Sequence, residues 1–211
     1  MAAEVWQRLV KNKMAMVGLA IIILLALAAI FADVIADYDT KVVAQHISDR
    51  LQGPSAQHWF GTDEFGRDIF ARMIHGSRVS LVVGLISVSV SLIAGGTLGA
   101  FAGYYGGRVD NVIMRIMDIF LAVPSILLAI TIVAALGTNL VNVMLAIGIS
   151  GTPGFARIVR AAVMSVKDQE FVEASKAIGA SNATIIFREI IPNCMAPIIV
   201  QATLSVAGAI L

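Results

Sequence analysis

The side chains that most often carry out chemistry are few in this sequence. Its three histidines, His46, His58 and His75, lack the close helical spacing of a metal-binding pair, so we expect loop residues and no metal site. Cys194 is the only cysteine, which excludes an intrachain disulfide and a thiolate metal cage. The sequence contains no GxxxxGK[ST] phosphate loop, so nucleotide chemistry must come from a partner. We therefore expect neither a cofactor nor a catalytic residue.

The composition indicates an all-α polytopic membrane protein. Hydrophobic residues make up 58% of the chain and charged residues 14%, whereas about a quarter of the residues in a soluble domain are charged. The apolar residues also come in long runs and not in amphipathic periods. A net charge of +1, with no basic stripe, argues against a nucleic-acid partner.

Four apolar stretches predict five membrane-spanning helices, because a hydrocarbon core of about 30 Å needs roughly 20 apolar residues in a helix. They cover residues 14–32, 79–107, 119–156 and 190–211. The third is too long for one helix, and the turn signal Gly137-Thr138-Asn139 divides it into two. The first has basic flanks like a signal peptide, but it ends without a small-residue cleavage pattern, so we expect a retained anchor.

The distribution of basic residues predicts a cytoplasmic N-terminus. This orientation puts nine basic residues on the cytoplasmic side, as the positive-inside rule requires: Arg8, Lys11, Lys13, Arg108, Arg157, Arg160, Lys167, Lys176 and Arg188. The expected organisation is then a cytoplasmic segment (1–13), a first transmembrane helix (14–36), an extracytoplasmic segment (37–76) and a helical core (77–211).

A polar, helix-forming stretch, FVEASKAIGASNATIIFREIIPN, interrupts the apolar core at residues 171–193. Residues 167–178 favour a helix, with Glu170 and Glu173 near its positive end. Gly179 is expected to cap it in the left-handed conformation.

A second short helix is expected to follow, with Ser181 as its N-cap and with Pro192 ending it or starting the next span. The residue types allow either a solvated loop or a docking element. For docking, the small residues would let another protein approach closely: Ala174, Ser175, Ala177 and Ala180.

This pattern resembles the EAA loop of permease subunits in binding-protein-dependent ABC importers: Glu173-Ala174-Ser175, then Gly179, then Pro192 at the expected distance. In that family the loop is the coupling helix, which fits a groove on the ATP-binding subunit. The resemblance implies a cytoplasmic coupling loop at 167–192, with contacts from Glu173, Ala174, Ser175, Ala177 and Gly179. Two departures are visible: Ser175 replaces the second alanine and Ile191 the usual leucine. Serine is small enough to keep the close approach.

The stretch HWFGTDEFGRDIFARMIHGSRVSL, at 58–81, is similar to the GTDxxGRD signature of C-type permeases for dipeptides and oligopeptides, within the peptide/nickel superfamily. RIMDIFLAVPSILLAI and IPNCMAPIIVQATLS are similar to that family too, so the matches run over nearly the whole chain. The signature residues could brace a gate, meet the substrate-binding protein, or form a short surface helix capped by Thr62 or Asp63. They are Gly61, Thr62, Asp63, Gly66, Arg67 and Asp68.

Three features at membrane depth leave alternatives open. Asp118 either serves the path or makes a structural pair, for which Arg115 is a candidate on the same helical face. Pro124 either kinks its helix to shape a cavity or is simply tolerated. A glycine stripe marks a packing seam, against a helix of this chain or of a second subunit: Gly95, Gly99 and Gly103.

The resemblance implies the type I permease fold of an ABC importer in a bacterial-type inner membrane, with this chain as a permease core that is not itself an enzyme. The implied partners are a second permease subunit, two ATP-binding subunits and an extracytoplasmic substrate-binding protein. Dipeptides or oligopeptides are the expected cargo, with glutathione or nickel as alternatives. A secondary transporter or channel would need ionisable residues within the spans, where only Asp118 occurs. The family's final helix is expected to be missing, because the sequence stops at Leu211 within an apolar run.

Overall fold

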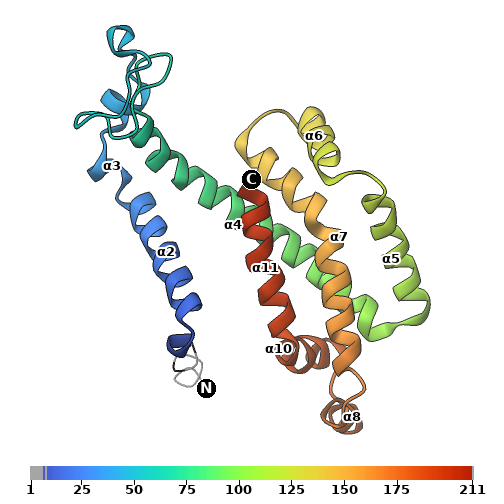
Figure 1. Cartoon of the computed structure of the whole chain (residues 1–211). Coiled ribbons are helices and arrows are strands. Elements are labelled where there is room, and N and C mark those ends of the chain that lie inside the picture. The colour runs from blue at the N-terminus through green and yellow to red at the C-terminus, as the bar shows by residue number, and fades with distance from the viewer. Residues whose placement is uncertain (1–6, 8, 211) are drawn as a thin grey trace. The chain divides into compact units, whose positions relative to one another are not determined.

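The computed structural model describes residue 7 and residues 9–210, and it is almost entirely helical within them (Figure 1). Arg8 and Leu211, which the sequence predictions include, lie outside the described residues. The longer helices are α2 (Lys13–Ile30), α4 (Ile69–Tyr105), α5 (Gly107–Leu121), α6 (Ser125–Leu136), α7 (Leu140–Val166), α8 (Glu170–Ala177) and α11 (Met195–Ile210). The shorter elements are α3 (Ala32–Ile35), η1 (Tyr38–Val43), η2 (Ile47–Asp49), α9 (Asn182–Thr184), η3 (Ile185–Ile190) and α10 (Ile191–Asn193).

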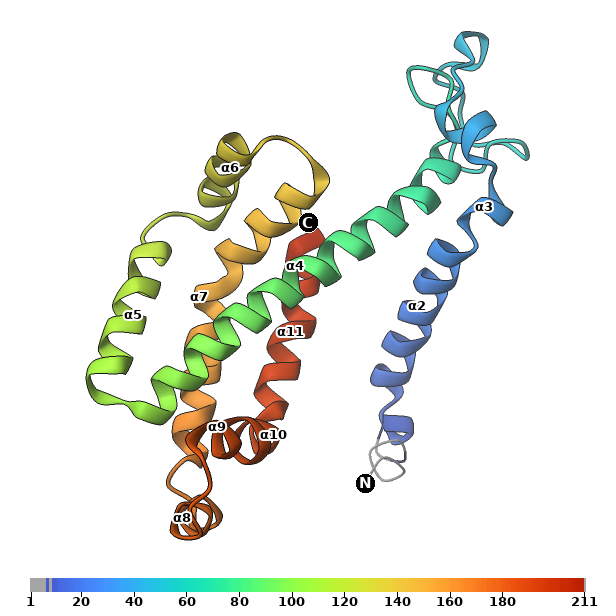
Figure 2. The ribbon, with the colours of Figure 1, turned by 180° about the vertical axis from the view of Figure 1, so that it is seen from behind.

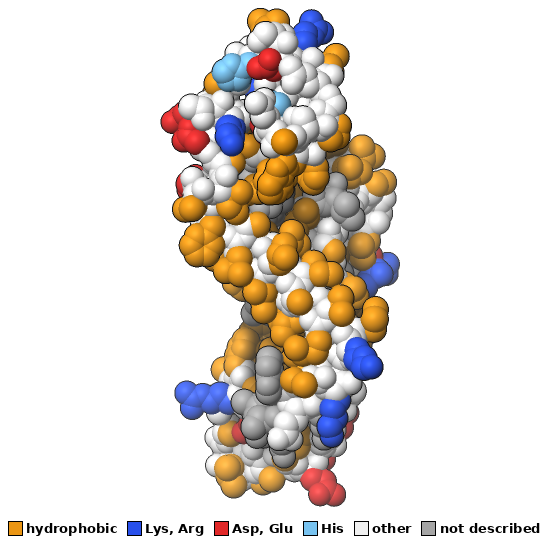
Figure 3. Space-filling model, turned by 60° about the vertical axis from the view of Figure 1, so that its left-hand side comes forward, with side chains coloured by type: hydrophobic (Ala, Val, Ile, Leu, Met, Phe, Trp, Pro, Cys, Tyr) orange, Lys and Arg blue, Asp and Glu red, His pale blue; other side chains and the backbone are white. Residues whose placement is uncertain are grey.

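Helices α2, α4 and α7 are each long and apolar enough to cross a membrane. Two further spans are possible from bent pairs, in which α5 and α6 meet at 87° and the helix at residues 182–193 meets α11 at 72°. Counting each bent pair as one span gives the five spans that the sequence predicts. In the face drawn in Figure 3, hydrophobic side chains cover a broad area, as expected for helices that contact lipid.

The predicted boundaries of two spans were wrong. Helix α4 begins at Ile69 and not at residue 79, because the Asp68 carboxylate accepts a hydrogen bond from the Ala71 N–H (2.9 Å) and so caps the helix there. The span expected from residue 119 begins at Gly107, because α5 is an amphipathic helix whose charged residues hid it from a search for apolar runs.

The chain divides into two compact units, Met1–Leu81 and Val82–Leu211. In the first, two side chains of α4 hold the end of α2 and the residues after it. Arg78 Nε donates to the Ala29 carbonyl (2.9 Å) and its Nη2 pairs with Asp33 (3.0 Å), while His75 Nε2 donates to the Ala36 carbonyl (2.8 Å). His75 is therefore a buried helical residue and not the loop residue expected, whereas His46 and His58 do lie outside the α-helices.

The second unit is built around α7, which contacts α5, α6 and α11 (Figures 1 and 2). Helix α4 joins it through the glycine stripe, so the predicted seam faces a helix of this chain. A Cβ added at Gly95 would overlap the Thr152 carbonyl, one at Gly99 the Ala156 carbonyl, and one at Gly103 would lie 2.8 Å from the Arg160 carbonyl. Only glycine at these positions allows the backbones of α4 and α7 to come so close. In lipid, this close van der Waals packing holds helices together in place of the hydrophobic effect.

We predict that Gly99→Ala lowers the thermal stability of the purified protein, because the added methyl group forces α4 away from α7. The matched control is Gly96→Ala. There the new Cβ would lie 3.8 Å from its nearest neighbour, Cδ1 of Leu92, which is an ordinary contact distance. Removing a helical glycine there should stabilise the protein by about 0.5–1 kcal/mol or change little. Equal unfolding temperatures for the two variants in one detergent would contradict a tight seam.

Candidate functional site

The candidate coupling loop, residues 167–192, follows directly from the end of α7. Lys167 is the C-cap of α7, its N–H bonded to the Val163 carbonyl (2.9 Å), so the predicted helix start at residue 167 was wrong. A short turn follows, and α8 starts at Glu170. Glu170 and Glu173 both lie in the first turn of α8, where carboxylates stabilise the positive end of the helix dipole.

Helix α8 ends in a complete Schellman motif. The Gly179 N–H bonds to the Lys176 carbonyl (3.0 Å), and the Ala180 N–H bonds to the Ser175 carbonyl (3.0 Å). Gly179 has φ +81°, so the predicted left-handed cap is confirmed. The motif reverses the chain within two residues and satisfies the last carbonyls of the helix.

The chain then returns through a second helical stretch. Ser181 caps it as predicted, its hydroxyl accepting from the Thr184 N–H (3.2 Å). This stretch widens to a π-helix over η3 and ends with α10 at Asn193. Pro192 lies in α10, where its missing N–H deprives the Arg188 carbonyl of an ordinary helical partner, consistent with the widened turn before it.

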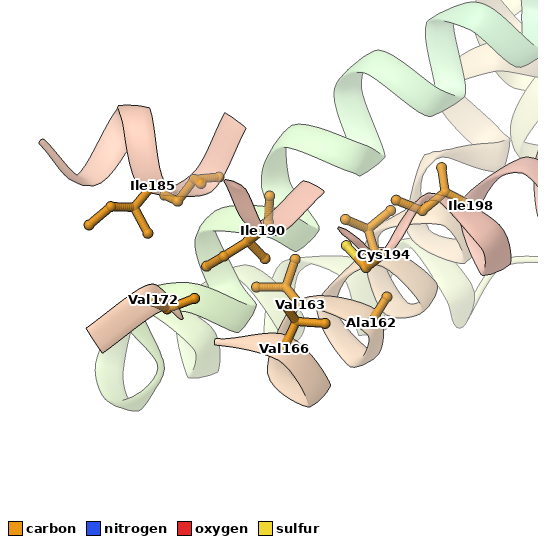
Figure 4. Close-up of a cluster of buried hydrophobic side chains, with 11 residues drawn as sticks. Ala162, Val163, Val166, Val172, Ile185, Ile190, Cys194 and Ile198 are labelled. Carbon is orange, nitrogen blue, oxygen red and sulfur yellow. The ribbon is translucent and has the colours of Figure 1, made fainter. Parts of the chain in front are cut away.

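The loop is fastened to α7 by buried aliphatic side chains. Val172 of α8 and Ile185, Ile186 and Ile190 of η3 are each 0% exposed and share one cluster with residues of α7. Figure 4 shows Val172 and Ile190 beside Val163 and Val166 of α7. Each fully buried side chain of this size contributes about 1.5–3 kcal/mol. Helix α8 is thus held on α7 by packing as well as by its short connection.

The opposite face of α8 is open and consists mostly of small side chains. Glu173, Ala174 and Ala177 are exposed, Ser175 is half-buried, and Ile178 beyond the helix is 84% exposed. Exposed apolar side chains such as Ile178 often mark protein interaction sites. The neighbouring alanines are small enough to let a partner protein come close, so this surface has the features of a docking site.

Asp118 pairs with Arg157 of α7 (Oδ1 to Nη2, 2.6 Å), so the sequence-based pairing with Arg115 was wrong. Asp118 lies in the last turns of α5, which begins at Gly107. Arg115 and Asp118 are neighbours in sequence, but Arg157 reaches the carboxylate from the antiparallel helix.

A second pair between the same helices was not predicted. Arg160 of α7 binds Asp110 of α5 through two nitrogens, each 2.5 Å from a carboxylate oxygen. Arg157 and Arg160 are three residues apart on one face of α7, and both were counted only as cytoplasmic charges. The signal that could have found the pairs is the presence of two acidic and two basic residues within helices that pack together.

Pro124 is the N-cap of α6, at the 87° break after α5, so the kink that the sequence allowed is present. Residues 122–124 leave the helical path between the two arms of the bent pair.

The GTDEFGRD signature at residues 61–68 is a tight turn, so the short helix that was one of its alternatives is not formed. Gly61 and Gly66 have φ near +75° (+75° and +73°), and a Cβ at either would overlap a carbonyl, of Gln52 and His46 respectively. Thr62 accepts from the Gln52 N–H (2.9 Å), and Asp68 pairs with His58 (2.9 Å).

Asp63 is the centre of this turn. Its Oδ1 accepts from the N–H groups of Phe65 (2.8 Å) and Arg67 (3.0 Å), and its Oδ2 meets the guanidinium groups of Arg67 (2.8 Å) and Arg72 (2.5 Å). Partial burial opposes ionisation, but these donors outweigh it and lower the pKa of Asp63 to about 2. The signature's carboxylate therefore holds the turn closed.

Comparison with known proteins identifies the family. Residues 95–211 match the model of the "binding-protein-dependent transport system inner membrane component", and residues 1–54 match that of the "N-terminal TM domain of oligopeptide transport permease C". The chain belongs to this permease family. Its members are transport subunits of ABC importers, not enzymes, so the predicted family and class are confirmed.

Permease relatives in several bacteria match nearly the whole chain. The dipeptide transport permease of Alkalihalophilus pseudofirmus is 54% identical over 99% of this chain and 68% of its own length. The di/tripeptide permease of Pseudomonas aeruginosa is 46% identical (99% and 70%), and the glutathione permease of Pectobacterium atrosepticum is 39% identical (99% and 69%). This chain spans about two thirds of the length of these curated relatives.

The fold of the permease agrees with a solved importer. An inward-facing structure of the MetNI methionine ABC transporter matches with a TM-score of 0.54 at 20% identity, over 63% of this chain and 67% of that chain. This likeness supports the predicted type I permease fold.

We predict that the permease's signature turn loosens in acid. Because the folded pKa of Asp63 (about 2) lies below its ordinary value of 3.8, the carboxylate stabilises the turn fully above pH 3.8 and loses this effect as the pH falls toward 2. The protection of the amides at residues 61–68 against hydrogen exchange, corrected for the intrinsic effect of pH on exchange, should fall across this interval.

In Asp63→Asn the fast exchange should already be present at pH 7. Glu64→Gln, which changes a neighbouring exposed carboxylate, is the control and should exchange like the wild type. A turn equally protected in Asp63→Asn and wild type at pH 7 would show that this carboxylate does not hold it.

Proposed function

We propose that this inner-membrane permease carries dipeptides or short oligopeptides in an ATP-driven importer. The assembly would contain a second permease subunit, two ATP-binding subunits and an extracytoplasmic substrate-binding protein. The observation that carries the proposal is the 54% identity to a dipeptide permease across 99% of this chain. Glutathione is the second candidate, because glutathione permeases are up to 44% identical over the same residues. Glutathione is itself a modified tripeptide, so one path could suit both classes.

We propose further that residues 167–192 are the coupling loop, in which α8 docks on an ATP-binding subunit. The exposed surface of Glu173, Ala174 and Ala177 supports this role, as does the burial of Val172 on the other side of the helix. Force applied to α8 would pass into α7 through the aliphatic cluster and then into the spans. Alternating access would follow from that movement.

The proposed orientation has a cytoplasmic N-terminus. Arg157 and Arg160 support it less than the sequence suggested, because both lie within α7 and pair with carboxylates of α5. The remaining described charges still favour it: Lys11, Lys13, Arg108, Lys167, Lys176 and Arg188. The signature turn then lies outside, where it would brace the gate or meet the substrate-binding protein. For Asp118 we propose a structural role, since Arg157 neutralises it.

We predict that Gly179→Val uncouples the importer. A left-handed valine costs roughly 1–2 kcal/mol or more, and relieving it would tilt α8 away from its docking position. Dialanine uptake into vesicles with all subunits should be lost, while the permease stays inserted. Ala174→Arg should act in the same way by placing a bulky charge at the interface.

The matched control is Gly107→Val. Gly107 also has a left-handed backbone (φ +52°), so valine there is strained in the same way. A new Cβ at Gly107 has no neighbouring atom within 4 Å, so the substitution does not touch α8. It should retain uptake and bind the ATP-binding subunits. Normal uptake, ATPase activity and subunit binding in both Gly179→Val and Ala174→Arg would return the loop to a solvated connection.

A further inference from the structure

A cavity lined by serines lies within the second unit. Its volume is about 240 Å³, and its walls come from α4, α6, α7 and α11. Five of its lining residues carry a hydroxyl group: Ser87, Ser91, Ser125, Ser150 and Ser205. None of the described residues that line it is charged. A buried hydroxyl without a partner is costly, so a cavity lined by hydroxyl groups favours a polar occupant over an apolar one.

Ser87 shows this need most clearly. Its residue is 1% exposed, and its hydroxyl finds no hydrogen-bond partner among the residues that the structure describes. On the same helix, the Ser91 hydroxyl donates to the Gly148 carbonyl (2.6 Å), and the exposed Ser89 hydroxyl donates to Leu85 (2.7 Å). Ser87 is thus a lining residue whose buried hydroxyl has no hydrogen-bond partner among the described residues, unlike the hydroxyls of Ser89 and Ser91.

The other walls supply a mixture of donors and acceptors. The Ser150 hydroxyl donates to the Ile147 carbonyl (2.9 Å), which leaves its oxygen free to accept. Ser205 accepts from Gln201 Nε2 (3.1 Å), which leaves its own proton free to donate.

The start of α6 contributes Ser125 to the lining. Ser125 is the first residue of α6, directly after the break at Pro124, and no described side chain caps this end. The first N–H groups of a helix lack partners within it, and they carry the positive end of its dipole. Non-helical backbone at membrane depth is tolerated where it lines a polar cavity. The position of the cavity beside Ser125 is therefore consistent with the helix break at Pro124.

We infer that this serine-lined cavity is a hydrogen-bonding subsite of the translocation path, which takes the main-chain amide groups of a peptide in transit. The inference rests on the proposed function. Hydroxyl groups both donate and accept, so they complement the N–H and C=O groups that every peptide carries. A wall without charges favours no particular side-chain charge, and the subsite therefore passes peptides of varied sequence.

The size of the cavity fits one part of a path. Complete ligand sites enclose about 300–1,000 Å³, so a cavity of 240 Å³ is smaller than a complete site. The second permease subunit would supply the facing wall.

Thiol labelling tests whether the cavity belongs to the path. Cys194 is the only cysteine, so Cys194→Ala gives a cysteine-free chain, into which Ser87→Cys is placed. In the assembled importer a small cationic methanethiosulfonate should modify this cysteine in at least one nucleotide state, and dialanine should slow the reaction. The control is Ser89→Cys on the exposed side of α4, which lipid should keep unreactive. Equal reactivity at both positions in every state would overturn the inference.

Transport provides the second test. Ser87→Val should reduce dialanine uptake about fivefold, as expected for one lost hydrogen bond, with binding-protein-stimulated ATPase activity retained. Ser87→Thr, which keeps the hydroxyl, should restore most of the uptake, and Ser89→Val should be unaffected. A wild-type importer that takes up no peptide would contradict the proposed function. Wild-type uptake together with unchanged uptake in Ser87→Val would contradict the subsite alone.

Discussion

The burial of Val172, Ile185, Ile186 and Ile190 against α7 is the interaction on which the rest of the permease's second unit depends. Each of these side chains is 0% exposed and lies in one cluster with residues of α7. Without them α8 would be tied to α7 only by a short turn. With them, a force on the exposed face of α8 has a packed route into the membrane.

Contacts deeper in the unit rely on different physics, because lipid removes the hydrophobic advantage of apolar packing. Helix α4 is joined to α7 by carbonyls in contact with Gly95, Gly99 and Gly103, and α5 is joined to α7 by Arg157 and Arg160. Helix α7 therefore carries the candidate coupling loop at one end, and its residues Ile147 and Ser150 line the serine-lined cavity. Under our proposals, one helix connects the ATP-driven movement to the peptide path.

Local rules predicted much of the coupling loop from sequence. Gly179 and Ser181 occupy their expected caps, because both roles depend on a few neighbouring residues. The partner of Asp118 could not be predicted in this way, since Arg157 is 39 residues away and only the packing of α5 on α7 brings it close. One sequence-based alternative had Thr62 or Asp63 cap a short helix, but the Asp63 carboxylate instead closes a turn, because Gly61 and Gly66 reverse the backbone around it. The serine-lined cavity likewise arises from tertiary packing, since its lining comes from four helices.

The central claim is that packing of the loop on α7 transmits the work of ATP hydrolysis. The most direct measurement is the number of dialanine molecules imported per ATP hydrolysed in reconstituted vesicles. In Ile186→Ala, whose truncated side chain leaves a void against α7, the account predicts that this ratio falls severalfold while the ATP-binding subunits stay bound. An unchanged ratio in Ile186→Ala, at whatever overall rate, would contradict the account.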